Sequence, residues 1–177
     1  MTKNNIVLIG MPGCGKSTIG VVLAKVLGYR FLDADLLIQE QEGRRLNQII
    51  EEEGIQGFDQ IENQVNASIQ AERTVIATGG SVVYGREAME HLGAIGTILY
   101  IKLPYEEIQK RLGDLNERGI TIKDGQTLLD LYRERVPLYE KYAHLTVETD
   151  GLELRDSVKR IKEKLEEQAL LSNSAIE

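Results

Sequence analysis

The stretch "GMPGCGKST", residues 10–18, decides the fold, because it has the Gly-x-x-x-x-Gly-Lys-Ser/Thr spacing of a phosphate-binding loop. The apolar run 6–9 precedes it, and the helical pattern 16–27 follows it. This is the strand–loop–helix setting in which backbone N–H groups and a helix N-terminus bind phosphate oxygens. The pattern predicts a nucleotide-binding α/β protein. A glycine-rich turn that binds nothing is the alternative.

Each residue type in this loop has an expected role. Lys16 should reach the β- and γ-phosphates of ATP, and the Ser17 hydroxyl should bind Mg²⁺. Cys14 is either a small filler side chain or a thiol activated by the helix N-terminus. The nucleotide-binding residues expected from the loop are Gly13, Cys14, Gly15, Lys16, Ser17 and Thr18.

Composition limits the possible partners and compartment. The chain has 177 residues, 42% of them hydrophobic and 28% charged, with a net charge of −7. We therefore expect one domain over residues 1–177, with no nucleic-acid or membrane partner. A single cysteine excludes an intrachain disulfide, and the short apolar run after the N-terminus does not resemble a signal peptide. These features predict a cytoplasmic protein.

Short β-rich runs alternate with amphipathic segments along the chain. Strands are expected at 5–10, 29–35, 73–80, 96–103 and 144–149. Helices are expected at 16–27, 36–71 with breaks near 43 and 54–57, 85–91, 104–113, 127–142 and 152–170, with a frayed tail at about 171–177. Strands separated by helices predict a parallel sheet covered on both faces, with ligands at the carboxyl ends of its strands.

Two acids follow the second expected strand. If the segment is extended, Asp33 and Asp35 point the same way, toward the crevice beside the phosphate loop. Asp33 is then placed to hold Mg²⁺, and Asp35 to accept a hydrogen bond from a substrate hydroxyl. The competing interpretation is that Asp35 only caps the following helix.

Glycines and arginines complete the candidate site. Gly79 and Gly80 end the third strand, where they either allow a ligand to approach the backbone or form a tight turn. Arg118 lies in an aperiodic stretch of about the length of a lid loop, which could bring its charge to the transferred phosphoryl group.

Taken together, these motifs resemble the shikimate kinase family of phosphate-loop (P-loop) kinases, over residues 5 to about 165. "FLDADLLI" at 31–38 resembles its Asp-x-Asp motif, "ERVPLYEKYA" at 134–143 the segment after its lid, and "VETDG" at 147–151 its adenine-side loop. The resemblance implies that Arg135 binds the shikimate carboxylate, that Arg118 is the lid arginine, and that Arg111 packs on adenine. It also implies a five-stranded parallel sheet, a lid at about 114–124, a substrate-binding helical region at about 35–64, use of ATP and Mg²⁺, and a monomer.

The chain departs from the family pattern on the acceptor side. "GIQGFDQIE" at 54–62 keeps Gly54, Phe58 and Glu62 of Gly-Glu-x-x-Phe-Arg-x-x-Glu, but Asp59 replaces the arginine. Losing a bidentate contact to a carboxylate should cost about 2–5 kcal/mol in a buried site. Three explanations are open: Arg44 or Arg45 compensates, Asp59 points outward, or the acceptor is another polyol, neutral or bearing an amine. A nucleotide-dependent regulatory module without acceptor chemistry is the alternative from another class.

Overall fold

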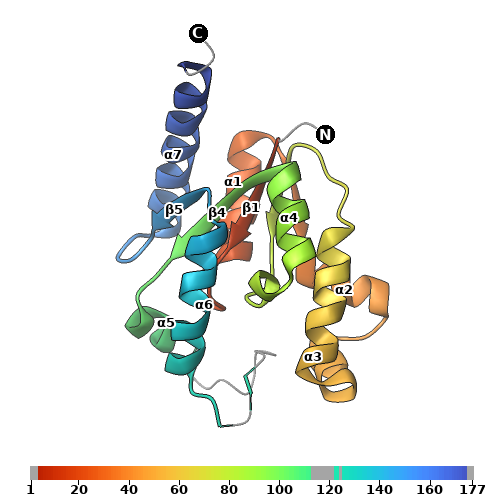
Figure 1. Ribbon diagram of the computed structural model, residues 1–177. Helices are drawn as coiled ribbons and strands as arrows, with labels where there is room; N and C mark the ends of the chain where they lie inside the picture. Colours follow the sequence, from red (N-terminus) through yellow and green to blue (C-terminus); the bar gives the residue numbers. More distant parts are fainter. Residues whose placement is uncertain (1–3, 113–121, 124, 175–177) are drawn as a thin grey trace.

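Five parallel strands form one sheet in the computed structural model, which describes residues 4–112, 122–123 and 125–174 (Figure 1). The strands are β1 (Asn5–Ile9), β2 (Arg30–Asp33), β3 (Thr74–Ala77), β4 (Gly96–Lys102) and β5 (Leu145–Glu148). Their order in the sheet is β2-β3-β1-β4-β5, and Leu8 at the centre pairs with Ala77 on one side and Leu99 on the other. The parallel sheet predicted from the sequence is confirmed.

The strands are connected by helices. These are α1 (Lys16–Leu27), α2 (Ala34–Glu42), α3 (Leu46–Ala67), the 3₁₀ turn η1 (Val82–Tyr84), α4 (Arg86–Ile95), α5 (Tyr105–Leu112), α6 (Leu128–Tyr142) and α7 (Leu154–Ser174). Within the described ranges, none of them is long and apolar enough to span a bilayer.

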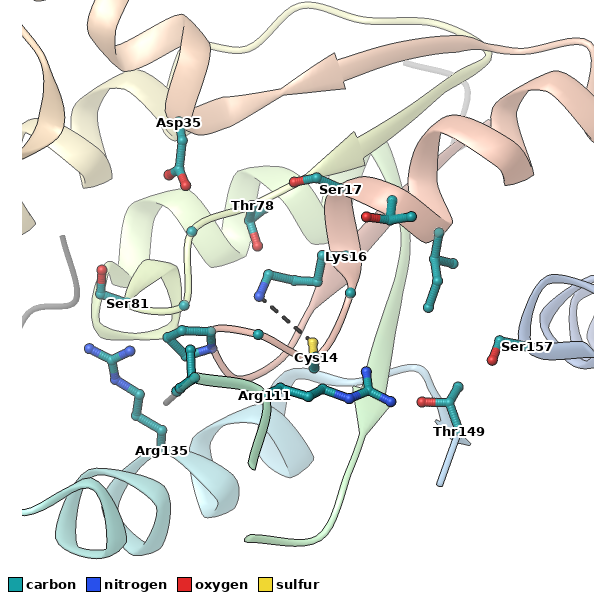
Figure 2. Close-up of a pocket in the computed structure, with 18 of the residues that line it drawn as sticks. Cys14, Lys16, Ser17, Asp35, Thr78, Ser81, Arg111, Arg135, Thr149 and Ser157 are labelled. Carbon is teal, nitrogen blue, oxygen red and sulfur yellow. Dashed lines mark hydrogen bonds between the residues drawn. The ribbon is translucent and has the colours of Figure 1, made fainter. Parts of the chain in front are cut away.

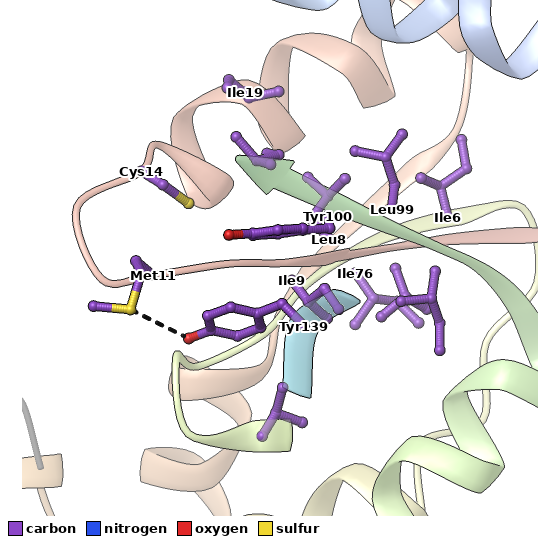
Figure 3. Packing of buried hydrophobic residues seen from close by; sticks show 14 of the residues in the cluster. Ile6, Leu8, Ile9, Met11, Cys14, Ile19, Ile76, Leu99, Tyr100 and Tyr139 are labelled. Atoms are coloured by element: carbon purple, nitrogen blue, oxygen red, sulfur yellow. Dashed lines mark hydrogen bonds between the residues drawn. The ribbon is translucent and has the colours of Figure 1, made fainter. Parts of the chain in front are cut away.

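Helices cover both faces of the sheet. On one face α1 packs against β1, β2 and β3, and α7 packs against α1 and β5. On the other face α4 and α6 pack against β4, and α3 lies beside α4. Figure 3 shows Ile19 of α1 and Tyr139 of α6 on opposite sides of the strands. All five residues of β1 are buried, as expected for a central strand that is covered on both faces.

Several element boundaries differ from the prediction. The second strand ends at Asp33 rather than residue 35, because the Asp33 side chain accepts hydrogen bonds from the backbone N–H groups of Asp35 and Leu36 and thereby caps α2. Helix α4 extends to Ile95, and α7 to Ser174, past the expected end at about 170. The predicted lid falls almost entirely outside the described residues.

The helix break predicted near 54–57 lies at Gly54, whose φ of 71° and ψ of 178° leave the helical region. This backbone conformation favours glycine over any other residue. Leu46 before the break and Phe58 after it both line the same cavity.

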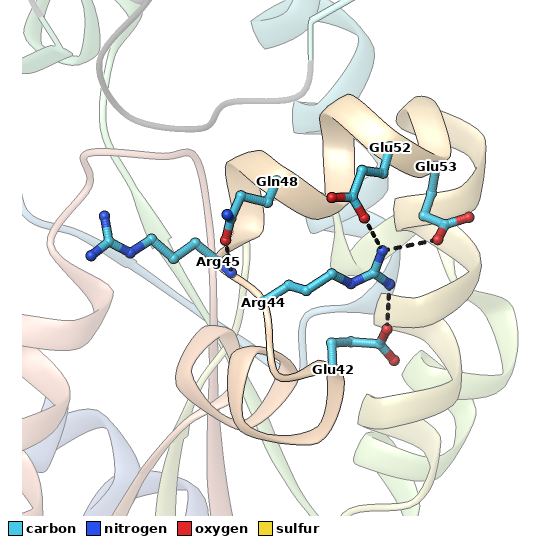
Figure 4. Close-up of polar contacts among 6 residues, drawn as sticks. All are labelled: Glu42, Arg44, Arg45, Gln48, Glu52 and Glu53. Atoms are coloured by element: carbon cyan, nitrogen blue, oxygen red, sulfur yellow. Dashed lines mark hydrogen bonds and ion pairs between the residues drawn. The ribbon is translucent and has the colours of Figure 1, made fainter.

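A cluster of charges fixes the corner between α2 and α3. Figure 4 shows the Arg44 guanidinium between three glutamates. It lies 2.7 Å from Glu42, 2.6 Å from Glu52 and 3.0 Å from Glu53, so it ties the end of α2 to the turn of α3 just before the break at Gly54. These hydrogen bonds raise the pKa of the Arg44 guanidinium above its usual range. The Arg44 side chain is only 27% exposed, which favours a network over an isolated surface pair.

We expect Arg44→Met to lower the melting temperature by a few degrees, because three acids at the corner lose their shared cation. Because Glu52 is 58% exposed, added salt should screen its interaction with Arg44 and reduce the difference in melting temperature between the variant and the parent. Arg86→Met is the matched control: Arg86 makes a single exposed pair with Glu90, and its replacement should have little effect. Equal melting temperatures for the Arg44→Met variant and the parent at low salt would contradict the prediction.

Candidate functional site

A cavity of about 600 Å³ opens at the carboxyl ends of β1, β2 and β3. Figure 2 shows Lys16, Asp35 and Arg135 directed toward it from three different elements. Its lining includes every predicted nucleotide-binding residue of the loop and, on the acceptor side, Asp35, Gly79, Gly80 and Arg135. The sequence therefore identified the phosphate-loop side of this cavity and part of its acceptor side.

The phosphate loop is closed by its own lysine. The Lys16 side chain is 8% exposed, and its ammonium group donates to the backbone oxygens of Gly10 at 2.7 Å and Met11 at 3.0 Å. Gly13 and Gly15 have φ values of 78° and 100°, which turn the backbone inward, and Gly15 precedes α1. Loop N–H groups, a helix N-terminus and a lysine thus meet at one place, as phosphate binding requires.

Cys14 is a filler side chain, as one of the two interpretations predicted. Its thiol is fully buried in the main hydrophobic cluster. If Gly10 carried a Cβ atom, that atom would lie only 2.9 Å from the Cys14 sulfur. The loop is therefore tightly packed around Cys14.

Asp33 and Asp35 do not point the same way along a strand, so that part of the prediction is wrong. Asp33, and not Asp35, caps α2; its second oxygen accepts a hydrogen bond from the Ser17 hydroxyl at 2.8 Å. Asp35 lies in the first turn of α2 and lines the cavity. Burial and the nearby Asp33 charge raise the pKa of Asp35, and Lys16 partly offsets this.

The Ser17–Asp33 pair is the candidate metal site. The described part of the chain contains no cluster of three or more acidic, histidine or cysteine side chains that could hold a metal by itself. Magnesium in phosphoryl-transfer enzymes is usually held by one or two protein oxygens together with substrate phosphates. A hydroxyl and a carboxylate beside a phosphate loop fit this donor set.

Glu62 is a wall residue that the sequence prediction omitted. It is 1% exposed, and one of its oxygens accepts a hydrogen bond from the Ser81 hydroxyl at 2.6 Å. Its other oxygen lies against Gly79, where a Cβ atom could not fit. Burial, above all, raises the pKa of Glu62 to about 8, and Asp35 and Asp59 contribute. The sequence signal for it was its place in the motif at 54–62, where Glu62 is one of the kept residues, but no role was assigned to it.

Arg135 is buried at the far wall and held by aromatic residues. Its side chain is 1% exposed, its Nε donates to the Tyr84 hydroxyl at 3.3 Å, and its guanidinium lies over the Tyr84 ring at 5.4 Å. One turn along α6, the Tyr139 hydroxyl donates to the Gly80 backbone oxygen at 2.6 Å. Helix α6 is thereby joined directly to the glycine turn after β3.

Asp59 does not line the main cavity, which corrects its predicted place in the acceptor site. It is half-buried and lines a neighbouring cavity of about 460 Å³ together with Asn63 and Tyr84. The Arg135–Tyr84 pair lies between the two cavities, since Arg135 lines one and Tyr84 the other. One Asp59 oxygen is buried without a described hydrogen-bond partner, and burial raises the pKa of this carboxyl group.

The compensation proposed for Asp59 is not seen. Arg44 is engaged by its three glutamates, and Figure 4 shows the exposed Arg45 side chain pointing away from that cluster. Neither arginine lines the main cavity.

The opposite end of the cavity is lined by Arg111 and by two buried hydroxyl side chains. Arg111 lines it and is oriented by Glu107, whose carboxylate accepts from its Nε at 2.8 Å. Thr149 and Ser157 are buried there, and the Thr149 hydroxyl has no described partner. Neither residue was predicted individually, although Thr149 belongs to the "VETDG" stretch. Arg118, the predicted lid arginine, lies outside the described residues.

The shifted pKa of Glu62 predicts how stability changes with pH. The native state keeps the Glu62 proton up to about pH 8, whereas the unfolded chain loses it near 4.5, so the native state binds more protons between these values. The free energy of unfolding should therefore fall as the pH rises through this window, at up to about 1.4 kcal/mol per pH unit.

We expect Glu62→Gln to remove this slope. Urea unfolding at pH 5.5 and 7.5 should show that the parent loses roughly 1–3 kcal/mol relative to the variant over this interval. Glu51→Gln, an exposed change on the same helix, should follow the parent. Parallel pH profiles for the parent and Glu62→Gln would contradict a buried, protonated Glu62.

Comparisons with known proteins agree with this geometry. The family described as shikimate kinase matches residues 12–166. A shikimate kinase from Clostridium botulinum (strain Alaska E43 / Type E3) is 36% identical over 162 residues, which cover 90% of this chain and 97% of the relative. One from Chlorobium chlorochromatii is 35% identical, with 91% and 90% covered.

Solved structures give the same result. Shikimate kinase from Acinetobacter baumannii in complex with shikimate superimposes with a TM-score of 0.82 at 35% identity, and the alignment covers 97% of this chain and 95% of that one. A gluconokinase from Sinorhizobium meliloti, at 18% identity and a TM-score of 0.51, shares only the fold. The chain belongs to the shikimate kinase family.

Proposed function

We propose that this protein transfers the γ-phosphoryl group of ATP, with Mg²⁺, to a ring hydroxyl of shikimate, giving shikimate 3-phosphate and ADP. The observation that carries the proposal is that Lys16, Asp35 and Arg135 line one cavity from three different elements. A phosphate-binding lysine, a carboxylate for the hydroxyl and a guanidinium for the carboxylate are the groups that this reaction needs.

The nucleotide end has the groups that ATP needs. The inward-turned loop and the N-terminus of α1 can bind the phosphates, and Thr149 and Ser157 can contact the nucleoside. Ser17 and Asp33 would hold Mg²⁺, which neutralises charge on the phosphates when bound. The family as a whole supports an ATP-dependent kinase.

At the acceptor end, Asp35 would orient the hydroxyl and accept its proton. A new bond forms between the acceptor oxygen and the γ-phosphorus, and the bond from that phosphorus to the β–γ bridging oxygen breaks, so ADP leaves. Asp35 lies in the first turn of α2 and lines the cavity, where a carboxylate can accept the hydroxyl proton. The proton then passes from Asp35 to solvent. Arg135, fixed by Tyr84, would hold the acceptor carboxylate.

We expect Lys16→Ala to lower kcat/KM at least about a hundredfold in an assay of ADP release with Mg²⁺, ATP and shikimate, because charge on the transferred group loses its cation. Lys25→Ala, an exposed change on the same helix, is the control and should keep the parent rate. A Lys16→Ala variant with the parent rate would show that the loop is not the nucleotide site.

Asp35→Asn should abolish transfer to shikimate while the affinity for ATP, measured by calorimetry, stays close to that of the parent. The amide keeps the shape of the side chain but cannot accept the hydroxyl proton as a base. A normal transfer rate in this variant would reduce Asp35 to a structural residue of α2. ADP release by the parent that does not respond to any added hydroxylated acceptor would instead favour a regulatory module over a kinase.

A further inference from the structure

A chain of two hydrogen bonds leads away from the acceptor side of the cavity, starting at Arg135. The Arg135 Nε donates to the Tyr84 hydroxyl at 3.3 Å, and that hydroxyl donates to a carboxylate oxygen of Glu134 at 2.5 Å. The groups at the two ends fix the direction of both bonds, because a guanidinium has only donors and a carboxylate only acceptors. The Tyr84 hydroxyl therefore turns a lone pair to Arg135 and its proton to Glu134.

Tyr84 joins two neighbouring residues of α6 that do not face each other. Consecutive residues of a helix point about 100° apart, so the side chains of Glu134 and Arg135 leave α6 in different directions. Tyr84 comes from η1, and the Arg135 guanidinium lies 5.4 Å from the centre of its ring. At the other end of the guanidinium, Nη1 lies 2.9 Å from the position that a Cβ atom on Gly80 would take. The Tyr84 bond thus helps to direct the guanidinium toward the turn that lines the cavity.

Glu134 is held from its other side by the residues just before α6. The Gln126 Nε2 donates to its second oxygen at 3.0 Å, and the Lys123 ammonium lies 3.7 Å from the oxygen that accepts from Tyr84. The Tyr84 hydrogen bond, above all, lowers the pKa of Glu134, while burial and the bond to Glu134 raise the pKa of Tyr84. At neutral pH the carboxylate is therefore charged and the phenol is neutral, as the direction of the chain requires.

We propose that Tyr84 and Glu134 are positioning residues for the acceptor: together they hold the Arg135 guanidinium in the orientation that binds an anionic group, and so make the site selective for an acceptor with a carboxylate. Neither is among the described residues that line the main cavity, so both act through Arg135. This inference rests on the proposed kinase function, in which Arg135 holds the acceptor carboxylate. The planar guanidinium must be aligned with a carboxylate to bind it, so losing this alignment weakens that contact most.

The test compares two acceptors with the full-length protein. One is shikimate, and the other is its neutral analogue with the carboxylate reduced to a hydroxymethyl group. Tyr84→Phe removes only the hydroxyl and keeps the ring beside the guanidinium. We expect the KM for shikimate to rise about fivefold, as for one lost hydrogen bond, while kcat stays within about twofold of the parent. The KM values for the neutral analogue and for ATP should not change.

Tyr132→Phe is the matched control for the loss of a tyrosine hydroxyl. Tyr132 lies on the same helix as Arg135 and donates to the backbone oxygen of Leu103 at 2.9 Å. It is not among the described residues that line either cavity. All three KM values of this variant should equal those of the parent, so that a change in Tyr84→Phe can be assigned to the contact with Arg135.

Two changes at Glu134 separate its hydrogen bond from its charge. Glu134→Ala removes the acceptor for the Tyr84 hydroxyl and should raise the KM for shikimate, whereas Glu134→Gln keeps an oxygen acceptor and should lie closer to the parent. If Glu134 acted only through its charge, both changes would lower the KM for an anion. Glu140→Ala, which removes a carboxylate paired with Lys102 on the same helix, is the control and should have no effect.

A double variant tests whether the two residues act as one chain. Because Tyr84→Phe and Glu134→Ala break the same series of bonds, their effects on the KM for shikimate should not add. The double variant should therefore resemble the more affected of the two single variants. Fully additive effects would show that the residues act independently and would contradict the chain.

The outcomes separate this inference from the proposed function. If shikimate is phosphorylated and its KM is the same in Tyr84→Phe and the parent, or if the KM for the neutral analogue rises by the same factor, the inference is overturned and the kinase function is intact. If ATP binds but the parent phosphorylates neither acceptor, the proposed function fails. Shikimate binding measured by calorimetry then decides the inference, which is overturned unless Tyr84→Phe weakens that binding by about fivefold.

Discussion

The bond between Lys16 and the backbone at the end of β1 is the constraint on which the site depends. The lysine begins α1, but its ammonium group reaches back to the carbonyl oxygens of Gly10 and Met11, so the loop is a closed ring of charge-assisted contacts. Because β1 is the central strand of the sheet, the core fixes the position of this ring. The loop residues that face the cavity are placed relative to it.

The acceptor end is organised differently, by side chains that reach across helices. Tyr139 ties α6 to the turn after β3, and Tyr84 holds the guanidinium of Arg135. Glu62 is held from α3 by the Ser81 hydroxyl. Each link joins residues about 20 to 60 positions apart in the chain, so the acceptor pocket exists only when α3, α6 and the turn have packed together.

How far the sequence predicts this molecule follows from the range of the interactions. The strand, loop and first helix could be predicted, because a local motif fixes them, and the loop residues from Gly13 to Thr18 do line the cavity. The geometry at Asp33 could not be predicted. The chain there could extend the strand or begin a helix, and the hydrogen bonds from two backbone N–H groups to the Asp33 side chain favour the helix. Asp59 lies beside the cavity rather than in it, although Phe58 and Glu62 of the same helical segment line it, and motif spacing does not show which side chains of a helix face a cavity. The role of Arg118 stays a prediction.

The two ends of the cavity differ in what a mutation can change. Around the phosphates the binding groups are mostly main-chain amides and tightly packed glycines, where a Cβ atom on Gly10 would contact the backbone oxygen of Ile101 at 2.7 Å. Around the acceptor they are side chains on α2, α3 and α6, namely Asp35, Glu62 and Arg135, each encoded by one codon. A single substitution can therefore change what the acceptor wall recognises, whereas the main-chain groups of the phosphate loop do not depend on the identity of a side chain.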